Sequence, residues 1–405
     1  MIKKLRRAIL PTDLLICAGL FVWVAAHIVS ETYFVELDPT APASIRTMLV
    51  RLPKVTSFLL MILGKAFKRR RVDETDVAWL CALALLYALG KYLGSTALFQ
   101  AALIVYLSSE IDLEEIYTVQ AWGILAPLIA IIALAAVGIV PEGNGLEATA
   151  SRVARSSFGF AWPSRVPNMV LAAIMAFALA RKGKFDNLTF GALALTTVVV
   201  FFATNSRNPF LLTVMLLVML FVFPTRTRSV TTRRFLRVFA LSFCWCFLVI
   251  FVLTAFYSPK FELMRFFNRI LSNRLLYAHA AFDTTGIALF GSPAYFGDQL
   301  VAGEGFIDSG YLRLLFSYGP IMCFLYIGLL TMGAWKKAEQ GDVVFVICVF
   351  IIAIHAIAET QIIDIVYTPI LYFAREALRF HGQKTIRVGK RAVQSDERSI
   401  VPWRR

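Results

Sequence analysis

The sequence has few charged residues for its length. Asp, Glu, Lys and Arg make up 17% of the 405 residues, whereas about 25% is usual in globular chains. Hydrophobic residues make up 59%, and the mean hydropathy is +0.70. A soluble core could not bury so much apolar surface, so the composition excludes a set of soluble domains. It indicates a polytopic, all-α integral membrane protein.

Cysteine is also scarce, and the sequence lacks a disulfide framework. The six cysteines all lie in apolar segments, where a thiol behaves as a small hydrophobic group. Cys244 and Cys246 have no second pair of ligands in the pattern of a zinc site. The basic N-terminus is followed by an apolar run without a small-residue cleavage signal, so we expect a retained helix there.

Basic residues outnumber acidic ones, 41 to 26, for a net charge of +15. They gather in short clusters between apolar runs, which is typical of cytoplasmic loops and not of nucleic-acid binding. About 20 apolar residues are needed to span a bilayer. We expect about twelve spans, at residues 11–30, 46–65, 76–93, 95–109, 117–140, 166–180, 187–204, 208–223, 236–257, 310–334, 342–358 and 364–380.

The basic clusters predict the topology of these spans. With the N-terminus inside, the clusters at 1–7, 65–71, 181–184, 226–237, 336–337 and 379–405 all fall on the cytoplasmic side. Both termini are then cytoplasmic, with a membrane domain over 1–380 and a basic tail over 381–405. Two long loops, at about 141–165 and 258–309, lie outside. Loops of this length are usually functional.

Arginines in three outer segments predict a site for an anionic ligand. Arg165 follows an aromatic stretch containing Trp162, Arg207 lies in a turn between two spans, and Arg274 lies in the larger loop. A guanidinium matches phosphate oxygens in two-point contacts. For each arginine taken alone, contact with lipid headgroups is the alternative interpretation.

Three outer residues could accept a proton, and each also has a purely structural interpretation. Asp308 would open a helix, where an acidic residue also serves as an N-terminal cap. Glu359 follows His355 by one helical turn and could pair with it. His279 in the larger loop could be a base or a structural hydrogen-bonding group. The His355 and Glu359 pair has no third ligand nearby, so we expect no metal site.

Taken in order, these segments resemble the bacterial polysaccharide polymerases of the Wzy type, which are related to the O-antigen ligases. The resemblance covers residues 118 to 373. Its elements are Ser-Phe-Gly-Phe at 157–160 with Pro167 and Asn168, Ser206 with Arg207, Asn273 with Arg274, Leu-Phe-Gly at 289–291, Asp-Ser-Gly-Tyr at 308–311 with Tyr318 and Gly319, and Glu359.

The resemblance implies a glycosyltransferase of the bacterial cytoplasmic membrane. It would join undecaprenyl-diphosphate-linked repeat units at the outer face to make capsule, exopolysaccharide or O-antigen. Arg207, Arg274 and Arg165 would bind the diphosphate, and Asn168, Tyr311 and Trp162 would bind other parts of the substrate. The family's histidine before Pro167 is missing here, so the base is left open among Asp308, Glu359 and His279.

No DxD metal motif occurs in the sequence, so the resemblance implies neither a metal nor another cofactor. The implied partners are the lipid-linked oligosaccharides and membrane lipids, with a flippase and a chain-length regulator as further candidates, and no nucleic acid. Two alternatives stay open: an O-antigen-type ligase with the same donor, and a flippase or transporter for the same lipids. A transporter is expected to carry helix breaks or charges at the bilayer midplane, often in two matching halves.

Overall fold

The computed structural model describes residues 11–36, 47–68, 74–142, 155–223, 229–293 and 307–377, and over these residues the chain is helical without a β-strand. A single bridge pairs Thr32 with Phe160. In the first half the helices are α1 (Pro11–Ser30), α2 (Tyr33–Glu36), η2 (Thr47–Arg51), α4 (Leu52–Lys68), α5 (Glu74–Leu93), α6 (Ala97–Leu107), α7 (Leu113–Ala136), α8 (Arg165–Arg181) and α9 (Asn187–Thr204).

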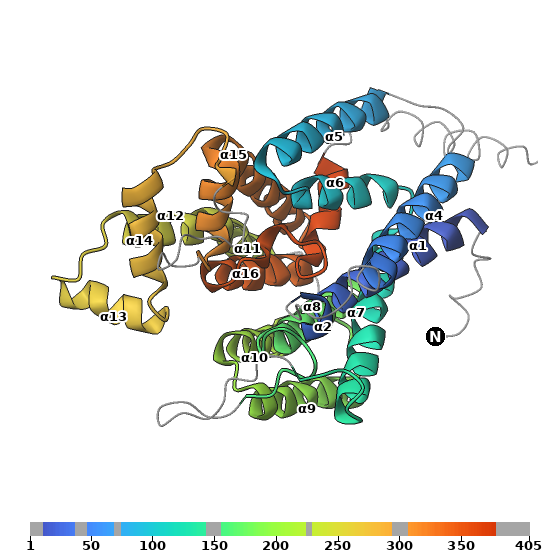
Figure 1. The fold of residues 1–405 in the computed structure, drawn as a ribbon, viewed down its shortest axis with the longest axis horizontal. Helices are drawn as coiled ribbons and strands as arrows, with labels where there is room; N and C mark the ends of the chain where they lie inside the picture. The colour runs from blue at the N-terminus through green and yellow to red at the C-terminus, as the bar shows by residue number, and fades with distance from the viewer. Residues whose placement is uncertain are drawn as a thin grey trace, which may run out of the picture.

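The second half continues in the same way (Figure 1). Its elements are α10 (Arg207–Val222), α11 (Val230–Ala240), α12 (Ser242–Ala255), α13 (Glu262–Ile270), α14 (Arg274–Thr285), α15 (Gly310–Glu339), α16 (Val343–Ala358), η4 (Gln361–Ile363), η5 (Pro369–Phe373) and α17 (Ala374–Ala377). The predicted tail at 381–405 lies outside the described residues, as do parts of both predicted outer loops.

Six stretches of helix in the described part are long and apolar enough to cross a membrane: α1, α5, α7, α9, α11 with α12, and α15. Three shorter apolar helices, α6, α10 and α16, accompany them. The expected all-α fold with apolar helices of membrane-spanning length is therefore confirmed over the described residues. The predicted spans at 11–30 and 187–204 coincide with α1 and α9. The count of twelve spans stays a prediction.

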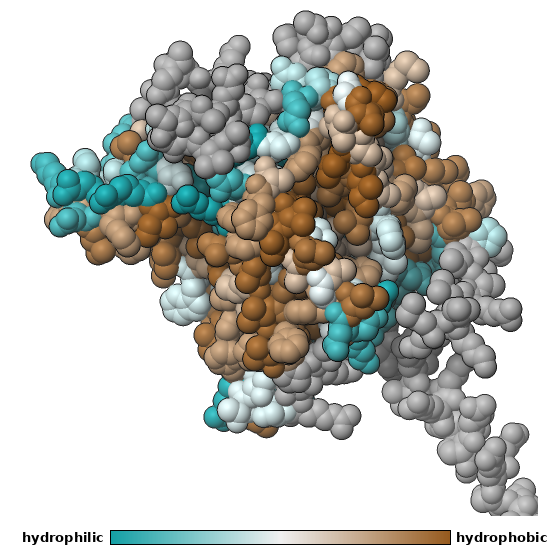
Figure 2. All heavy atoms as spheres, turned by 90° about the horizontal axis from the view of Figure 1, so that it is seen from below, coloured by the Kyte–Doolittle hydropathy of each residue, from teal (hydrophilic) through white to brown (hydrophobic). Residues whose placement is uncertain are grey.

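Two helices form the centre of the bundle. Thirteen of the 17 residues of α8 are buried, and thirteen of the 16 residues of α16. A helix that is buried on all sides must be surrounded by other helices. In contrast, α9 buries only Thr197 and Thr204. Large apolar side chains cover much of the outer surface (Figure 2), as expected for helices that face lipid.

Ion pairs show which helix ends share a side of the bundle. Lys68 at the end of α4 pairs with Asp13 at the start of α1, at 2.6 Å. Arg237 in α11 lies 3.5 Å from Glu339 at the end of α15. Lys68 also donates to the Glu110 carbonyl, and Arg375, two residues after the Phe373 ring that Lys337 covers near the end of α15, donates to the Ser108 carbonyl. Both pairs therefore lie on one side, which we call the Asp13 face. The opposite side, where α1 and α16 end and α8 and α15 begin, is the Glu31 face.

The predicted last span at 364–380 is not a single helix over the part that the structure describes. Residues 361–377 form two short 3-10 segments and a four-residue helix instead of one long helix. Pro369 cannot donate a backbone hydrogen bond, and the preceding Thr368 has a non-helical backbone conformation. The Gln120 amide instead donates to the carbonyls of Ile365 and Val366, at 2.7 and 3.0 Å, which satisfies this irregular backbone inside the bundle.

Helix α15 is interrupted where it meets the larger predicted loop. Gly319 has φ +81°, ψ 165° and precedes Pro320, so the helical path breaks there. Gly291, also at positive φ, packs directly on this break, and Ser292 donates to the Phe316 carbonyl at 3.1 Å. Any side chain at either glycine would collide with the other segment's backbone. Two motifs far apart in the sequence thus fit together through their glycines.

Candidate functional site

Arg274, Asp308, Glu359 and Asn168 meet on the Glu31 face, and we call these four residues the Arg274 cluster. The Arg274 Nε lies 2.9 Å from Asp308 Oδ2, and its Nη2 lies 3.9 Å from Glu359 Oε1. Asn168 Nδ2 donates to Glu359 Oε2 at 3.3 Å. Side-chain exposure is 22% for Arg274, 16% for Glu359 and 35% for Asp308. The cluster is thus shielded but reachable.

The amide of Asn168 connects this cluster to the bundle core. Its Oδ1 lies 3.2 Å from Nε2 of the buried His355. Because the same amide donates to Glu359, its oxygen faces the imidazole, which fixes Nε2 of His355 as the donor. His355 therefore orients Asn168, and Asn168 orients the carboxylate. The predicted link between His355 and Glu359 runs through this amide.

Glu359 lies directly after the end of α16, where its backbone is already extended. Burial raises the pKa of its carboxyl above the ordinary value, while the Arg274 charge opposes the increase. A carboxylate with a raised pKa accepts a proton better near neutral pH than an exposed one. Among the groups in the cluster, Glu359 therefore has the chemistry of a general base.

Asp308 does not cap α15, which overturns the structural interpretation of this residue. The N-cap position belongs to Ser309, and Asp308 turns its carboxylate to Arg274 instead. Arg274 itself opens α14, after Ser272 and Asn273 in the left-handed region. That tight turn and the Asp308 carboxylate together fix where the guanidinium lies.

A second network lies at the end of α1, and we call it the Glu31 cluster: His27, Glu31, Arg165, Asp364 and Tyr367. Arg165 Nε lies 3.1 Å from Glu31 Oε2, to which the Tyr367 hydroxyl donates at 2.5 Å. His27 Nε2 lies 2.8 Å from Asp364 Oδ2 and 3.4 Å from Glu31 Oε1.

The two clusters are joined through α8. Arg165 opens this helix and Asn168 follows one turn later, so one helix end supplies a side chain to each cluster. Burial would raise the pKa of Glu31, but Arg165 and His27 hold it at about 2. The charge of Arg165 also acts on Glu359 and on Arg313. Arg165, Arg274 and Arg313 therefore each add a positive charge to this face.

His27, Glu31 and Asp364 have the residue types of a metal site, with ligand atoms within 4.8 Å of one another. However, one Glu31 oxygen is already used by Arg165 and Tyr367. Lys54 lies close enough for its charge to act on both carboxylates. Arg165 and Lys54 thus neutralise the carboxylates of Glu31 and Asp364, as a divalent ion would. We therefore interpret the cluster as an ion-pair network.

We expect Glu31→Gln to destabilise the protein strongly. The amide keeps a hydrogen bond with Tyr367 but leaves the partly buried Arg165 without its counter-charge, which costs about 3 kcal/mol. Thermal unfolding in detergent measures the loss. Glu339→Gln on the Asp13 face, where the pair is half exposed, serves as the control and should unfold close to the parent temperature. Equal unfolding temperatures for the parent and Glu31→Gln would contradict this role.

His279 and Arg207, which were predicted as site residues, lie apart from these clusters. His279 Nδ1 lies 2.9 Å from the Thr254 carbonyl, so it connects α14 to α12. It is five residues from Arg274, which is roughly 140° around a helix. Arg207 is exposed at the start of α10 and pairs with no acidic residue that the structure describes. An apolar groove of about 290 Å³ runs between α9 and α10.

The three predicted substrate-binding residues lie in different surroundings. Asn168 is in the Arg274 cluster. Tyr311 is fully buried, with its hydroxyl donating to the Ala353 carbonyl at 2.9 Å, so it packs α15 on α16. Trp162 is 43% exposed, and its carbonyl accepts from the Arg165 backbone N–H at 3.1 Å. It therefore borders the Glu31 cluster from the outside.

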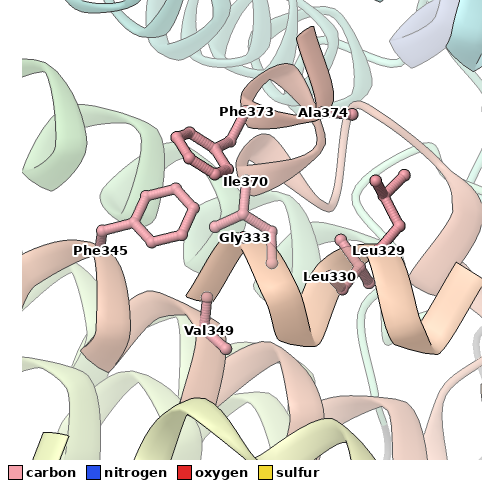
Figure 3. A pocket seen from close by; sticks show the side chains of 8 residues that line it. All are labelled: Leu329, Leu330, Gly333, Phe345, Val349, Ile370, Phe373 and Ala374. Carbon is pink, nitrogen blue, oxygen red and sulfur yellow. The ribbon is translucent and has the colours of Figure 1, made fainter. Parts of the chain in front are cut away.

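The small cavity in Figure 3 is not part of this site. It lies among α15, α16 and η5, where Gly333 packs on the ring of Phe373 and the Phe345 ring lies 5.1 Å from that ring. Its volume is about 10 Å³, and the residues that line it are apolar. It is a small gap in the packing between the C-terminal segment and the bundle.

Comparison with known proteins adds no assignment. No family model matches the chain, and neither a curated protein nor a solved structure is similar to it.

Proposed function

We propose that the protein is a membrane glycosyltransferase of the polysaccharide polymerase type. It joins undecaprenyl-diphosphate-linked repeat units, and the Arg274 cluster is its reaction centre. The proposal depends on one observation, which is that residues from separate motifs lie together. Asn168, Arg274, Asp308 and Glu359 come from four separate elements of the family resemblance, and all four lie within one connected set of contacts.

The geometry supports a division of roles. Glycosyl transfer from a lipid diphosphate develops positive charge on the sugar and negative charge on the leaving group. Arg274, with Arg165 nearby, stabilises the departing diphosphate. Glu359 takes the proton from the acceptor hydroxyl, and Asp308 positions Arg274. In this proposal His279 and Tyr311 are structural residues.

Arg207 keeps its predicted contact with a lipid phosphate, at a place separate from Arg274. Arg207, Val214, Val218 and Phe221 share one face of α10, because their spacing of 7, 11 and 14 residues is close to whole turns. The latter three line the apolar groove. The groove is suited to a lipid chain, and the guanidinium lies on the same helix face two turns before it.

The proposed orientation places the Glu31 face outside the cytoplasmic membrane and both termini inside. It follows from the basic clusters. We expect a membrane-impermeant thiol reagent to label Lys260→Cys in intact cells, while Lys184→Cys is labelled only after permeabilisation. Both positions are exposed, and the parent chain serves as the blank. The reverse pattern would invert the proposed topology.

Reconstitution tests the activity itself. Purified protein in vesicles, given lipid-linked repeat units on the side of the Glu31 face, should yield a ladder of longer lipid-linked glycans. A ligase would instead transfer the glycan to a different lipid acceptor. Repeat units that are neither lengthened nor transferred to an added lipid acceptor, with folded parent protein inserted in the vesicles, would refute both enzymes.

A transporter for the same lipids is the second candidate. The break of α15 at Gly319 and Pro320 favours it, because interrupted helices are common at transport sites. Translocation of fluorescent lipid-linked sugar across the vesicle, with no lengthening, would select this alternative.

A further inference from the structure

Helix α13 projects from the bundle and has an apolar stripe that no described residue covers. It lies at the lower left of Figure 1 and packs on α14. Leu263, Phe266 and Ile270, at helical spacing, are 63%, 51% and 61% exposed. Phe261 just before the helix is 64% exposed. Four large exposed apolar side chains on so short a segment indicate that something covers them.

The charged residues of α13 form a second stripe beside the apolar one. Glu262, Arg265 and Arg269 recur at three- and four-residue spacing, and Lys260 precedes them. The arm at the left of Figure 2 shows this division, with polar residues along one edge and apolar residues along the other. Three cations against one acid make the charged stripe complementary to phosphate groups.

The orientation of this helix is fixed by its remaining side. Asn268 is buried; its Nδ2 donates to Asn273 Oδ1 at 3.0 Å, and its Oδ1 accepts from the Leu276 N–H at 3.1 Å. The Asn273 N–H also donates to the Asn268 carbonyl at 2.8 Å. Helix α13 therefore cannot turn its apolar stripe toward the bundle without breaking these bonds.

We propose that α13 lies in the lipid–water interface on the Glu31 face. Its apolar stripe enters the upper acyl region, and its arginines and Lys260 contact lipid phosphates. A short helix with a large apolar face and a cationic face is typical of interfacial helices. Because Arg274 opens α14 four residues after α13 ends, the bilayer surface sets the depth of the Arg274 cluster. This placement is independent of the reaction proposed above.

Spin labels test the placement directly. In a chain whose six cysteines are replaced by alanine, Phe266→Cys and Arg265→Cys are labelled and reconstituted in vesicles of phosphatidylcholine and phosphatidylglycerol. We expect the label at 266 to be relaxed more by oxygen than by a water-soluble nickel complex, and the label at 265 to show the opposite. Leu195→Cys in α9 and Lys184→Cys give the membrane and aqueous standards.

Two outcomes would overturn the proposal. A label at 266 that the nickel complex relaxes as strongly as the one at 184 would place α13 in water. A label that neither reagent reaches would show that a second copy or another protein covers the stripe. Ile270→Cys repeats the measurement if Phe266→Cys does not yield folded protein, since both side chains belong to the same stripe.

Discussion

Replacing Glu359 by Gln is expected to lower the rate of glycan lengthening by about 10²- to 10⁴-fold, the range for loss of a general base. Glutamine has nearly the same shape and can still accept from Asn168, so the packing is preserved. It cannot take a proton from a sugar hydroxyl. The measurement is the initial rate in reconstituted vesicles. Glu339→Gln, the same exchange on the Asp13 face, should retain the parent rate.

The pH dependence of the parent protein's lengthening rate should also reflect a base with the raised pKa of Glu359. A base works when deprotonated, and burial raises the pKa of Glu359, so activity should fall on acidification at a higher pH than for an exposed glutamate. The Asn168 hydrogen bond counteracts this rise in pKa. Asn168→Ala should therefore move the acidic limb of the rate profile to still higher pH. An unchanged limb would exclude Glu359 as the titrating group, as would full activity of Glu359→Gln.

Replacing Arg274 by Lys should reduce the lengthening rate by about 10²-fold or more, although the positive charge is kept. Lysine has no planar fork, so it cannot contact Asp308 and Glu359 in this geometry while facing a diphosphate. The lost interaction serves the leaving group, so we expect kcat to fall more than KM rises. The assay is the concentration dependence of the rate with lipid-linked donor.

Two further variants make the Arg274 result specific. Arg237→Lys exchanges the same residue types in the half-exposed pair with Glu339, and it should leave the rate unchanged. Asp308→Asn removes the charge that positions Arg274 but keeps an acceptor for its Nε, so it should cause a smaller loss than Arg274→Lys. Parent-like kinetics for Arg274→Lys would remove this residue from the reaction centre.

Hydropathy alone predicted the helices that consist of one long apolar run. The bounds of α1 and α9 follow from long apolar runs ended by polar residues. The same criterion failed at 364–380, because an apolar segment buried within a bundle need not be helical when a side chain such as Gln120 satisfies its backbone. The ionisable Asp364 inside that expected span was the available warning.

The Glu31 cluster escaped the sequence analysis for a different reason. His27 and Glu31 have the same four-residue spacing as His355 and Glu359, and that repeated signal could have been noticed at the end of the first span. Their partners Arg165 and Tyr367 could not have been assigned, because the register between helices is set by packing. For Arg274, Asp308 and Glu359, the predicted topology placed all three on the outer side, and the family resemblance indicated that they share a site.

The contacts that complete this site join distant parts of the chain. Tyr367 lies 336 residues from Glu31, and Glu359 lies 191 residues from Asn168. During synthesis, α1 and α8 must therefore remain in the membrane with part of their charged surface unmatched until residues 359 to 367 leave the ribosome. Arg165 can already pair with Glu31 at that stage, whereas His27 and Asn168 still lack Asp364 and Glu359. A partly made protein consequently holds no assembled Arg274 cluster, and the cluster forms only after nearly the whole chain has been translated.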